Sequence, residues 1–155
     1  GLCFLTSIPF RILYKYLLMG RFTPAGQFRI CATSACIGAI LLLRQWQLVL
    51  DDRFAILLAD CIIFPSAFLC DSITFSRAMR CSLPTGSLLD SNHISFWCNL
   101  FGAGLGRVAG PWMGRYLIEA YDVFGQDLFA ILQLIYCVLM IAIFEIWVHP
   151  IMAAD

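Results

Sequence analysis

Apolar residues gather in five stretches along the chain, separated by short polar connections. The first stretch is truncated and the other four are long; the stretches cover residues 1–14, 28–46, 53–74, 94–118 and 128–148. At a rise of about 1.5 Å per residue, each of the last four can cross about 30 Å of hydrocarbon. Lipid offers no hydrogen-bonding partners to open strands, so each stretch must be helical. The pattern predicts an all-α, polytopic transmembrane helix bundle that forms one domain over residues 1–155.

The composition supports this prediction. Of the 155 residues, 61% are hydrophobic and 13% are charged, whereas a soluble domain carries about 25% charged residues. These values exclude a disordered chain and an ordinary soluble domain. The ten basic and ten acidic residues cancel, so no positive field attracts the chain to phosphates and we expect no nucleic-acid partner. The expected surroundings are a lipid bilayer.

Basic residues are distributed unevenly between alternate connections. The first and third connections hold six of them: Arg11, Lys15, Arg21, Arg29, Arg77 and Arg80. The second and fourth hold at most Arg44, Arg53 and Arg115, beside five acids. Since positive connections stay on the cytoplasmic side, the first and third connections are predicted to be cytoplasmic. We therefore expect a multi-pass integral membrane protein with a cytoplasmic C-terminus.

Glycines recur every four residues in the fourth stretch. Gly102, Gly106, Gly110 and Gly114 share one face of a helix at this spacing, and Pro111 follows Gly110 directly. Such a face lets a neighbouring backbone approach closely, and a proline removes a backbone hydrogen bond and bends the helix. Two interpretations are open: a static packing face, or a bent seam on which two groups of helices rock.

Two charged residues fall inside predicted spans. Arg107 lies about 20 Å into the fourth stretch, and Asp60 lies about 10 Å into the third stretch from the opposite side, so their depths match. A charge at that depth is costly unless it is paired or hydrated. One interpretation is a water-lined substrate or coupling cavity formed by the pair, and the other is a snorkelling Arg107 with a hydrated Asp60. Pro65 with Ser66 predicts a local break in the third stretch, where freed carbonyls face a cavity.

No catalytic or metal-binding constellation stands out. The eight cysteines include no C-x-x-C pair, and most of them lie in apolar stretches, so we expect packed, reduced thiols and no metal. The serines near His93 form no G-x-S-x-G elbow. Lys15 is the single lysine, and no phosphate-cradling glycine loop precedes it. We therefore expect neither an enzyme nor a cofactor.

The segment Gly106-Arg-Val-Ala-Gly110-Pro111-Trp-Met-Gly114 resembles the G-x-x-x-G-P-x-x-G element of the antiporter motif in the major facilitator superfamily. In that family the element normally lies in the fifth helix, whose counterpart in the second half is the eleventh. Arg115 stands where the motif has a second glycine, and Trp97 where it has an upstream glycine. The resemblance implies a partial major-facilitator-like fold, from the end of helix eight to helix twelve. A chain that opens inside an apolar stretch fits such a fragment.

The resemblance implies a membrane transporter that moves a small solute by alternating access, with a site near the midplane between two halves. Its expected partners are a small-molecule or ion substrate and the missing N-terminal half of the same protein. The alternative is a non-transporting polytopic membrane protein, either a receptor-like bundle or an assembly subunit, which a glycine face would serve equally well. The charges at Asp60 and Arg107 favour transport.

Overall fold

The computed structural model describes residues 2–18, 20–47 and 52–150, and over these ranges the chain is all-helical, as the sequence predicts. The helices are α1 (Leu2–Leu18), α2 (Pro24–Leu41), α3 (Arg44–Gln47), α4 (Asp52–Arg80), α5 (Ser91–Cys98), a π-helical segment (Asn99–Leu105), α6 (Gly106–Tyr121), α7 (Val123–Ile143) and a second π-helical segment (Phe144–Val148).

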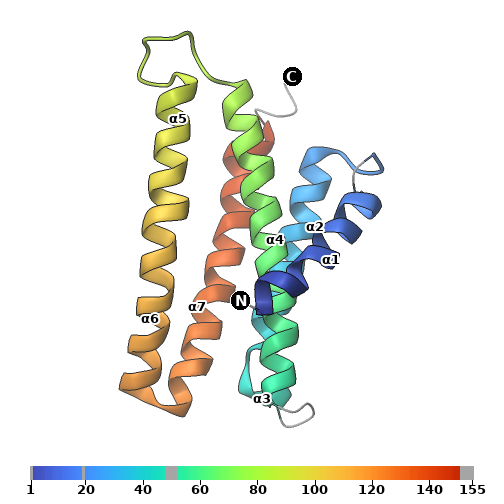
Figure 1. The fold of residues 1–155 in the computed structure, drawn as a ribbon, viewed down its shortest axis with the longest axis vertical. Helices are drawn as coiled ribbons and strands as arrows, with labels where there is room; N and C mark the ends of the chain where they lie inside the picture. Colours follow the sequence, from blue (N-terminus) through green and yellow to red (C-terminus); the bar gives the residue numbers. More distant parts are fainter. Residues whose placement is uncertain (1, 19, 48–51, 151–155) are drawn as a thin grey trace.

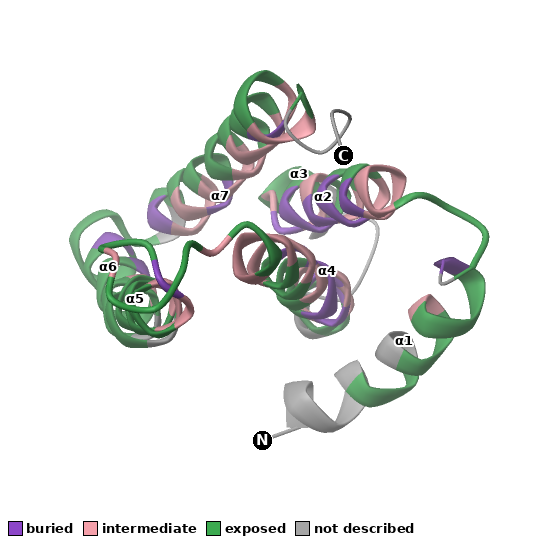
Figure 2. Ribbon diagram, turned by 90° about the horizontal axis from the view of Figure 1, so that it is seen from above, coloured by how far each residue is buried: buried purple, intermediate pink, exposed green. Residues whose placement is uncertain are grey.

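Helices α2, α4 and α7 form the centre of the bundle. Helix α2 packs against both α4 and α7, while α1 packs against α4 and lies at the edge of the molecule (Figures 1 and 2). Helix α5, the π-helical segment after it and α6 follow one another without a break, and we call this long helix the 91–121 arm. The arm contacts α4 through α5 and contacts α7 through α6. Most of its surface is exposed, as Figure 2 shows.

The connections alternate between the two ends of the bundle (Figure 1). The α1–α2 turn and the loop between α4 and α5 lie at one end, together with the last described residues. Helix α3 and the α6–α7 turn lie at the other end. We call these the basic end and the acidic end, because Arg21, Arg77 and Arg80 belong to the first and Glu119, Asp122 and Asp127 to the second. This is the alternation that the charge pattern predicts.

Two helices extend beyond the apolar stretches that the sequence predicts. The third stretch ends near residue 74, whereas α4 continues to Arg80. Arg77 and Arg80 then lie in its last turn, where positive charge interacts favourably with the helix dipole. The predicted acidic connection from Glu119 to Asp127 shrinks to Asp122 alone, which has a φ of 49° and joins α6 to α7.

The tight α6–α7 turn depends on Gly125. A Cβ atom at this position would collide with the backbone of Leu117 and Ile118. The amide of Asp122 donates to the carbonyl of Ile118 (2.9 Å), and the amide of Gly125 donates to the carbonyl of Asp122 (3.1 Å). Only a residue without a side chain lets the first turn of α7 lie so close to α6.

Local turn chemistry sets the starts of α2 and α5. Thr23 caps α2, since its hydroxyl accepts from the amide of Gly26 (3.2 Å), and Pro24 occupies the first turn. The loop before α5 turns at Gly86, which has a φ of 98°. Buried Asp90 then caps α5 by accepting from the backbone amide of His93 (2.8 Å). This hydrogen bond lowers the pKa of Asp90 below its usual range.

Two buried clusters hold the central helices together. In the first, near the basic end, the rings of Phe28 and Phe144 stack with centroids 3.8 Å apart, among Leu18, Cys31, Ala32 and Cys70. Beside it, Arg29 donates two hydrogen bonds to the carboxylate of Glu145, from Nε to Oε1 (2.5 Å) and from Nη2 to Oε2 (2.8 Å). The second cluster consists of Leu42 at the end of α2, Ala59 of α4 and Ala130 of α7.

Two helices of the described chain, Phe54–Arg80 and Phe124–Val148, are long and apolar enough to cross a membrane. Four such helices were expected, so the described structure supports half of them by length and composition. In the second helix only 11% of the most apolar stretch is buried, whereas the core helix of a soluble protein is mostly buried. Its outward face carries large apolar side chains: Ile131, Ile135, Val138, Leu139, Ile143, Ile146 and Trp147.

Replacing Asp90 with alanine should lower the free energy of unfolding by about 1 kcal/mol at neutral pH, because α5 loses its cap. Since the pKa of Asp90 is lowered in the folded protein, its stabilisation is complete above the unfolded-state pKa of about 3.9 and is lost as the pH falls through the lower folded-state value. Melting temperatures of wild type and Asp90→Ala in detergent should therefore converge in strong acid. Asp90→Asn keeps an acceptor and should keep the cap without this pH dependence. Equal melting temperatures for wild type and Asp90→Ala at neutral pH would refute the capping role.

Candidate functional site

A cavity of about 200 Å³ lies between α2, α4 and α7, and we call it the α7 cavity. Small side chains of α2, those of Ala32, Ala35 and Ala39, form one wall, and Ile63 and Ala67 of α4 form a second. The third wall comes from α7 and consists of Gln133, Tyr136, Cys137 and Met140. Since an apolar cavity of about 150 Å³ holds benzene, this cavity can take a solute of similar size.

Gln133 gives the α7 cavity its polar character. It lies about 14 Å along the apolar helix that begins at Phe124, close to the middle of that helix. Its Oε1 atom is buried and accepts no hydrogen bond from any described residue. Leaving such an acceptor unpaired costs about 1–3 kcal/mol, so a ligand that donates an N–H or O–H to this oxygen would recover that energy.

Ser66 is the second buried polar side chain without a partner among the described residues. It follows Pro65 in α4, and both side chains are fully buried. The predicted break at Pro65 is wrong, because α4 is helical from Asp52 to Arg80. Packing on all sides therefore keeps the helix continuous through the proline.

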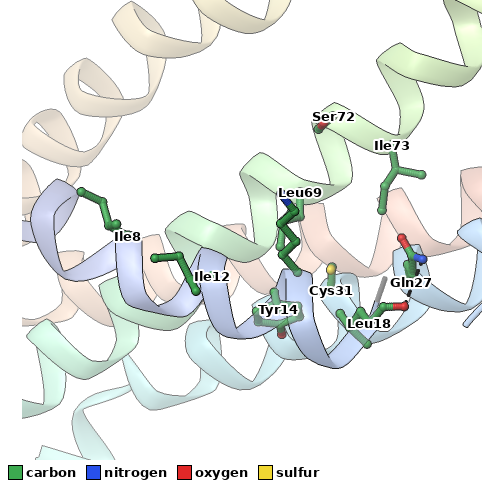
Figure 3. Close-up of a pocket in the computed structure, with 10 residues that line it drawn as sticks. Ile8, Ile12, Tyr14, Leu18, Gln27, Cys31, Leu69, Ser72 and Ile73 are labelled. Carbon is green, nitrogen blue, oxygen red and sulfur yellow. Dashed lines mark hydrogen bonds between the residues drawn. The ribbon is translucent and has the colours of Figure 1, made fainter. Parts of the chain in front are cut away.

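A larger pocket of about 450 Å³ lies between α1, α2 and α4, and we call it the α1 pocket (Figure 3). Ile8 and Ile12 follow each other along α1 on one side of it, and Leu69, Ser72 and Ile73 line α4 on the other. The remaining lining residues lie toward the basic end or at the back of the pocket: Tyr14, Lys15, Leu18, Gln27 and Cys31.

Most polar groups around the α1 pocket are already engaged. The hydroxyl of Tyr14 donates to Ser34 of α2 (2.7 Å). The side-chain amide of Gln27 donates to the carbonyls of Leu18 (3.2 Å) and Phe22 (3.0 Å) and so fixes the α1–α2 turn. Lys15 differs, since its exposed ammonium forms no ion pair with any residue that the structure describes.

Of the predicted pair of Arg107 and Asp60, the structure describes the side chain of Asp60 alone. The backbone of Arg107 lies in the first turn of α6, but its side chain is outside the described residues. Asp60 is half-buried on α4, one turn before Ile63 of the α7 cavity, and its side chain has an interaction partner. The two residues belong to the 91–121 arm and the central bundle, respectively.

Within the residues that the structure describes, no other helix packs closely along most of the glycine face. Cβ atoms added at Gly102 and Gly110 would meet nothing within 4 Å, and one at Gly106 would meet only the carbonyl of Phe101 in its own helix. Gly114 alone packs against another helix, through the ring of Phe129 (3.3 Å). The arm also continues through Pro111 to Tyr121. Its π-helical segment, Asn99–Leu105, lies upstream of the proline.

The glycine that does mediate close packing in the centre is Gly38, which the sequence reasoning missed. A Cβ atom here would lie 2.5 Å from Cγ1 of Ile63 and 3.2 Å from the carbonyl oxygen of Ala59. The signal was present in the run of small residues at Ala35, Gly38 and Ala39. Gln133 was also missed, although it is the one amide within the apolar stretch 128–148.

Comparison of the chain with protein families, with curated proteins and with solved structures finds no match to any of them. The assignment of function therefore depends on the site itself.

Replacing Gly38 with alanine should destabilise the protein by about 1–3 kcal/mol, because the new methyl group forces α2 away from α4. The matched variant Gly110→Ala places a methyl group in open space and should leave stability unchanged or raise it slightly. Melting temperatures in detergent measure both effects. A larger loss for Gly110→Ala than for Gly38→Ala would mean that another helix covers the glycine face.

Proposed function

We propose that this chain is the membrane-embedded part of a transporter that moves a small solute by alternating access. The observation that carries the proposal concerns Gln133, which lines the α7 cavity in the middle of a highly apolar helix. Its buried Oε1 has no hydrogen-bond partner within the described chain. Polar groups at membrane depth are costly and mark substrate pathways, and solute sites of transporters lie near the bilayer midplane. The cavity volume favours a solute of benzene size with at least one hydrogen-bond donor.

The exposed apolar surface supports a location in the bilayer. A soluble monomer rarely exposes a contiguous apolar patch beyond a few hundred Å², whereas α7 and the π-helical segment after it expose large apolar side chains from Ile131 to Trp147. In this proposal the helices cross the membrane repeatedly, with the basic end and the C-terminus in the cytoplasm. The alternation of the connections between the two ends supports repeated crossing, and the basic residues at one end support the orientation.

The 91–121 arm is proposed to face the rest of the transporter. Its open glycine face, at Gly102, Gly106 and Gly110, has the small residues that close packing of membrane helices requires. In this proposal the N-terminal half of the same protein covers this face, and Arg107 and Asp60 contribute charge to the cavity between the halves. The major-facilitator-like arrangement belongs to the same proposal.

The same open face favours a second function, that of an assembly subunit which docks the arm onto another membrane protein without transport. The two functions differ at Gln133, because only a transporter needs its unpaired oxygen.

Cysteines placed at Thr85 and Ala120 should react with a membrane-impermeant maleimide from opposite sides of sealed vesicles. Both positions are exposed, Thr85 in the loop at the basic end and Ala120 near the acidic end. The native cysteines are first replaced by alanine, and labelling is read by mass shift on a gel. Labelling of both positions from the same side would refute the orientation.

The natural polypeptide that contains this chain, reconstituted in liposomes, should accelerate the entry of at least one small polar solute from a panel of glycerol, urea, glycine and acetate. Stopped-flow light scattering measures the entry rate. Gln133→Leu should reduce the accelerated rate roughly tenfold, because the solute loses a buried hydrogen bond. Arg107→Lys should also reduce it if Arg107 holds an anionic solute through its planar fork.

The control is Gln45→Leu, which removes an exposed amide far from the cavity and should leave the rate unchanged. If no solute of the panel enters these liposomes faster than it enters protein-free liposomes, the transport proposal is overturned in favour of the assembly subunit. Entry that is insensitive to Gln133→Leu would place the pathway outside the α7 cavity.

A further inference from the structure

The α1 pocket combines a long apolar wall with one unpaired cation. Ile8, Ile12, Leu69 and Ile73 supply the wall. Lys15, one turn before the end of α1, supplies an ammonium that forms no ion pair within the described chain. An exposed ammonium beside an apolar wall is suited to a ligand that combines an anion for Lys15 with an apolar part for the wall.

The position of the pocket fits a ligand that enters from the bilayer. Lys15 belongs to the last turn of α1, and the α1–α2 turn that follows lies at the basic end (Figure 1), where lipid headgroups meet water in the proposed orientation. Ile8 and Ile12 lie earlier along α1 (Figure 3). Ile8 is 42% exposed and Ile12 is 52% exposed, so the pocket opens along the side of the bundle. A ligand in it would therefore have its charge near the interface and its apolar part toward the membrane interior.

The volume sets the size of the apolar part. At about 450 Å³ the pocket is within the range of about 300–1,000 Å³ that is usual for ligand sites. It is roughly three times the volume of a cavity that holds benzene, which is room for about a dozen carbon atoms or more. A small inorganic anion would leave most of this apolar wall uncovered, whereas one acyl chain would fill it.

We propose that the α1 pocket binds an anionic lipid of the surrounding bilayer. One acyl chain lies along Ile8, Ile12, Leu69 and Ile73, and the phosphate accepts from the ammonium of Lys15. The hydroxyl of Ser72, which also lines the pocket, is a second donor for the headgroup. Basic pockets between membrane helices on the cytoplasmic side have the chemistry to hold such headgroups. The proposal rests on the membrane location given above but does not require transport.

The test is lipid binding to the purified full chain in a neutral maltoside detergent, followed by native mass spectrometry of the first bound lipid. Phosphatidylglycerol should bind at least fivefold more tightly than phosphatidylcholine with the same acyl chains. Lys15→Gln should reduce the preference for phosphatidylglycerol roughly fivefold, whereas Lys15→Arg should retain the preference. Arg80→Gln is the matched control, since Arg80 is exposed at the same end but does not line the pocket.

A second pair of variants tests the acyl chain. Ile73→Trp fills the pocket and should weaken both lipids, whereas Ile37→Trp alters an exposed position outside it and should weaken neither. Equal binding of the two lipids, or a preference that survives Lys15→Gln, would overturn the proposal. Competition by glycerol phosphate as strong as by the whole lipid would mean a soluble-anion site instead.

None of these measurements involves solute flux. A negative flux experiment therefore does not contradict the lipid site, and a negative lipid titration does not contradict the transport proposal.

Discussion

The close approach of α2 to α4 is the contact on which the rest of the fold depends. In the proposed membrane location, burying apolar side chains would give no advantage over lipid, and helices would associate through van der Waals packing at small residues. Helix α2 supplies these at Ala32, Ala35, Gly38 and Ala39, and Gly38 lies within contact of the backbone of Ala59. The same small face leaves room for α7 beside it, and the α7 cavity is the space that these short side chains do not fill.

Polar contacts then fix α7 against α2 at both ends. At the basic end Arg29 and Glu145 form a two-point ion pair. At the acidic end the carboxylate of Asp127 accepts from the amide of Arg44 (2.8 Å), and Gln126 donates to the carbonyl of Leu42 (3.4 Å). Charged groups are cheapest near the membrane surfaces, so both contacts occupy the ends of the helices. Gln133 lies between these contacts on α7, and its unpaired oxygen is where the proposed solute would bind.

Sequence reasoning recovered the helical class and the alternation of the connections between two ends, because each depends on local runs of side chains. Of the four long spans it expected, two are long and apolar enough in the described chain. It failed where the outcome depends on contacts between segments. The acidic residues 119–127 suggested a loop, but Gly125 lets α7 start directly against Leu117. The regular spacing of Gly102, Gly106 and Gly110 identified a face but not its partner, and the irregular small residues of α2 form the tighter contact. For Arg107, whose side chain is outside the described residues, the predicted pairing with Asp60 stays a prediction.

The two faces of the 91–121 arm are suited to different surroundings. Two residues on an α-helix are separated by about 200° when they are two positions apart, so Gly106 and Gly110 lie opposite Val108 and Trp112. The side chains of Val108 and Trp112 are exposed, at 71% and 69% respectively, and Trp112 stacks on Tyr116 with centroids 6.0 Å apart. Large apolar and aromatic groups are well matched to acyl chains and the membrane interface. A glycine face offers lipid little contact and offers a helix a close approach. In the proposed membrane location the arm would turn Val108 and Trp112 to lipid and its glycine face to another helix, and within the described chain no helix covers Gly102 or Gly110.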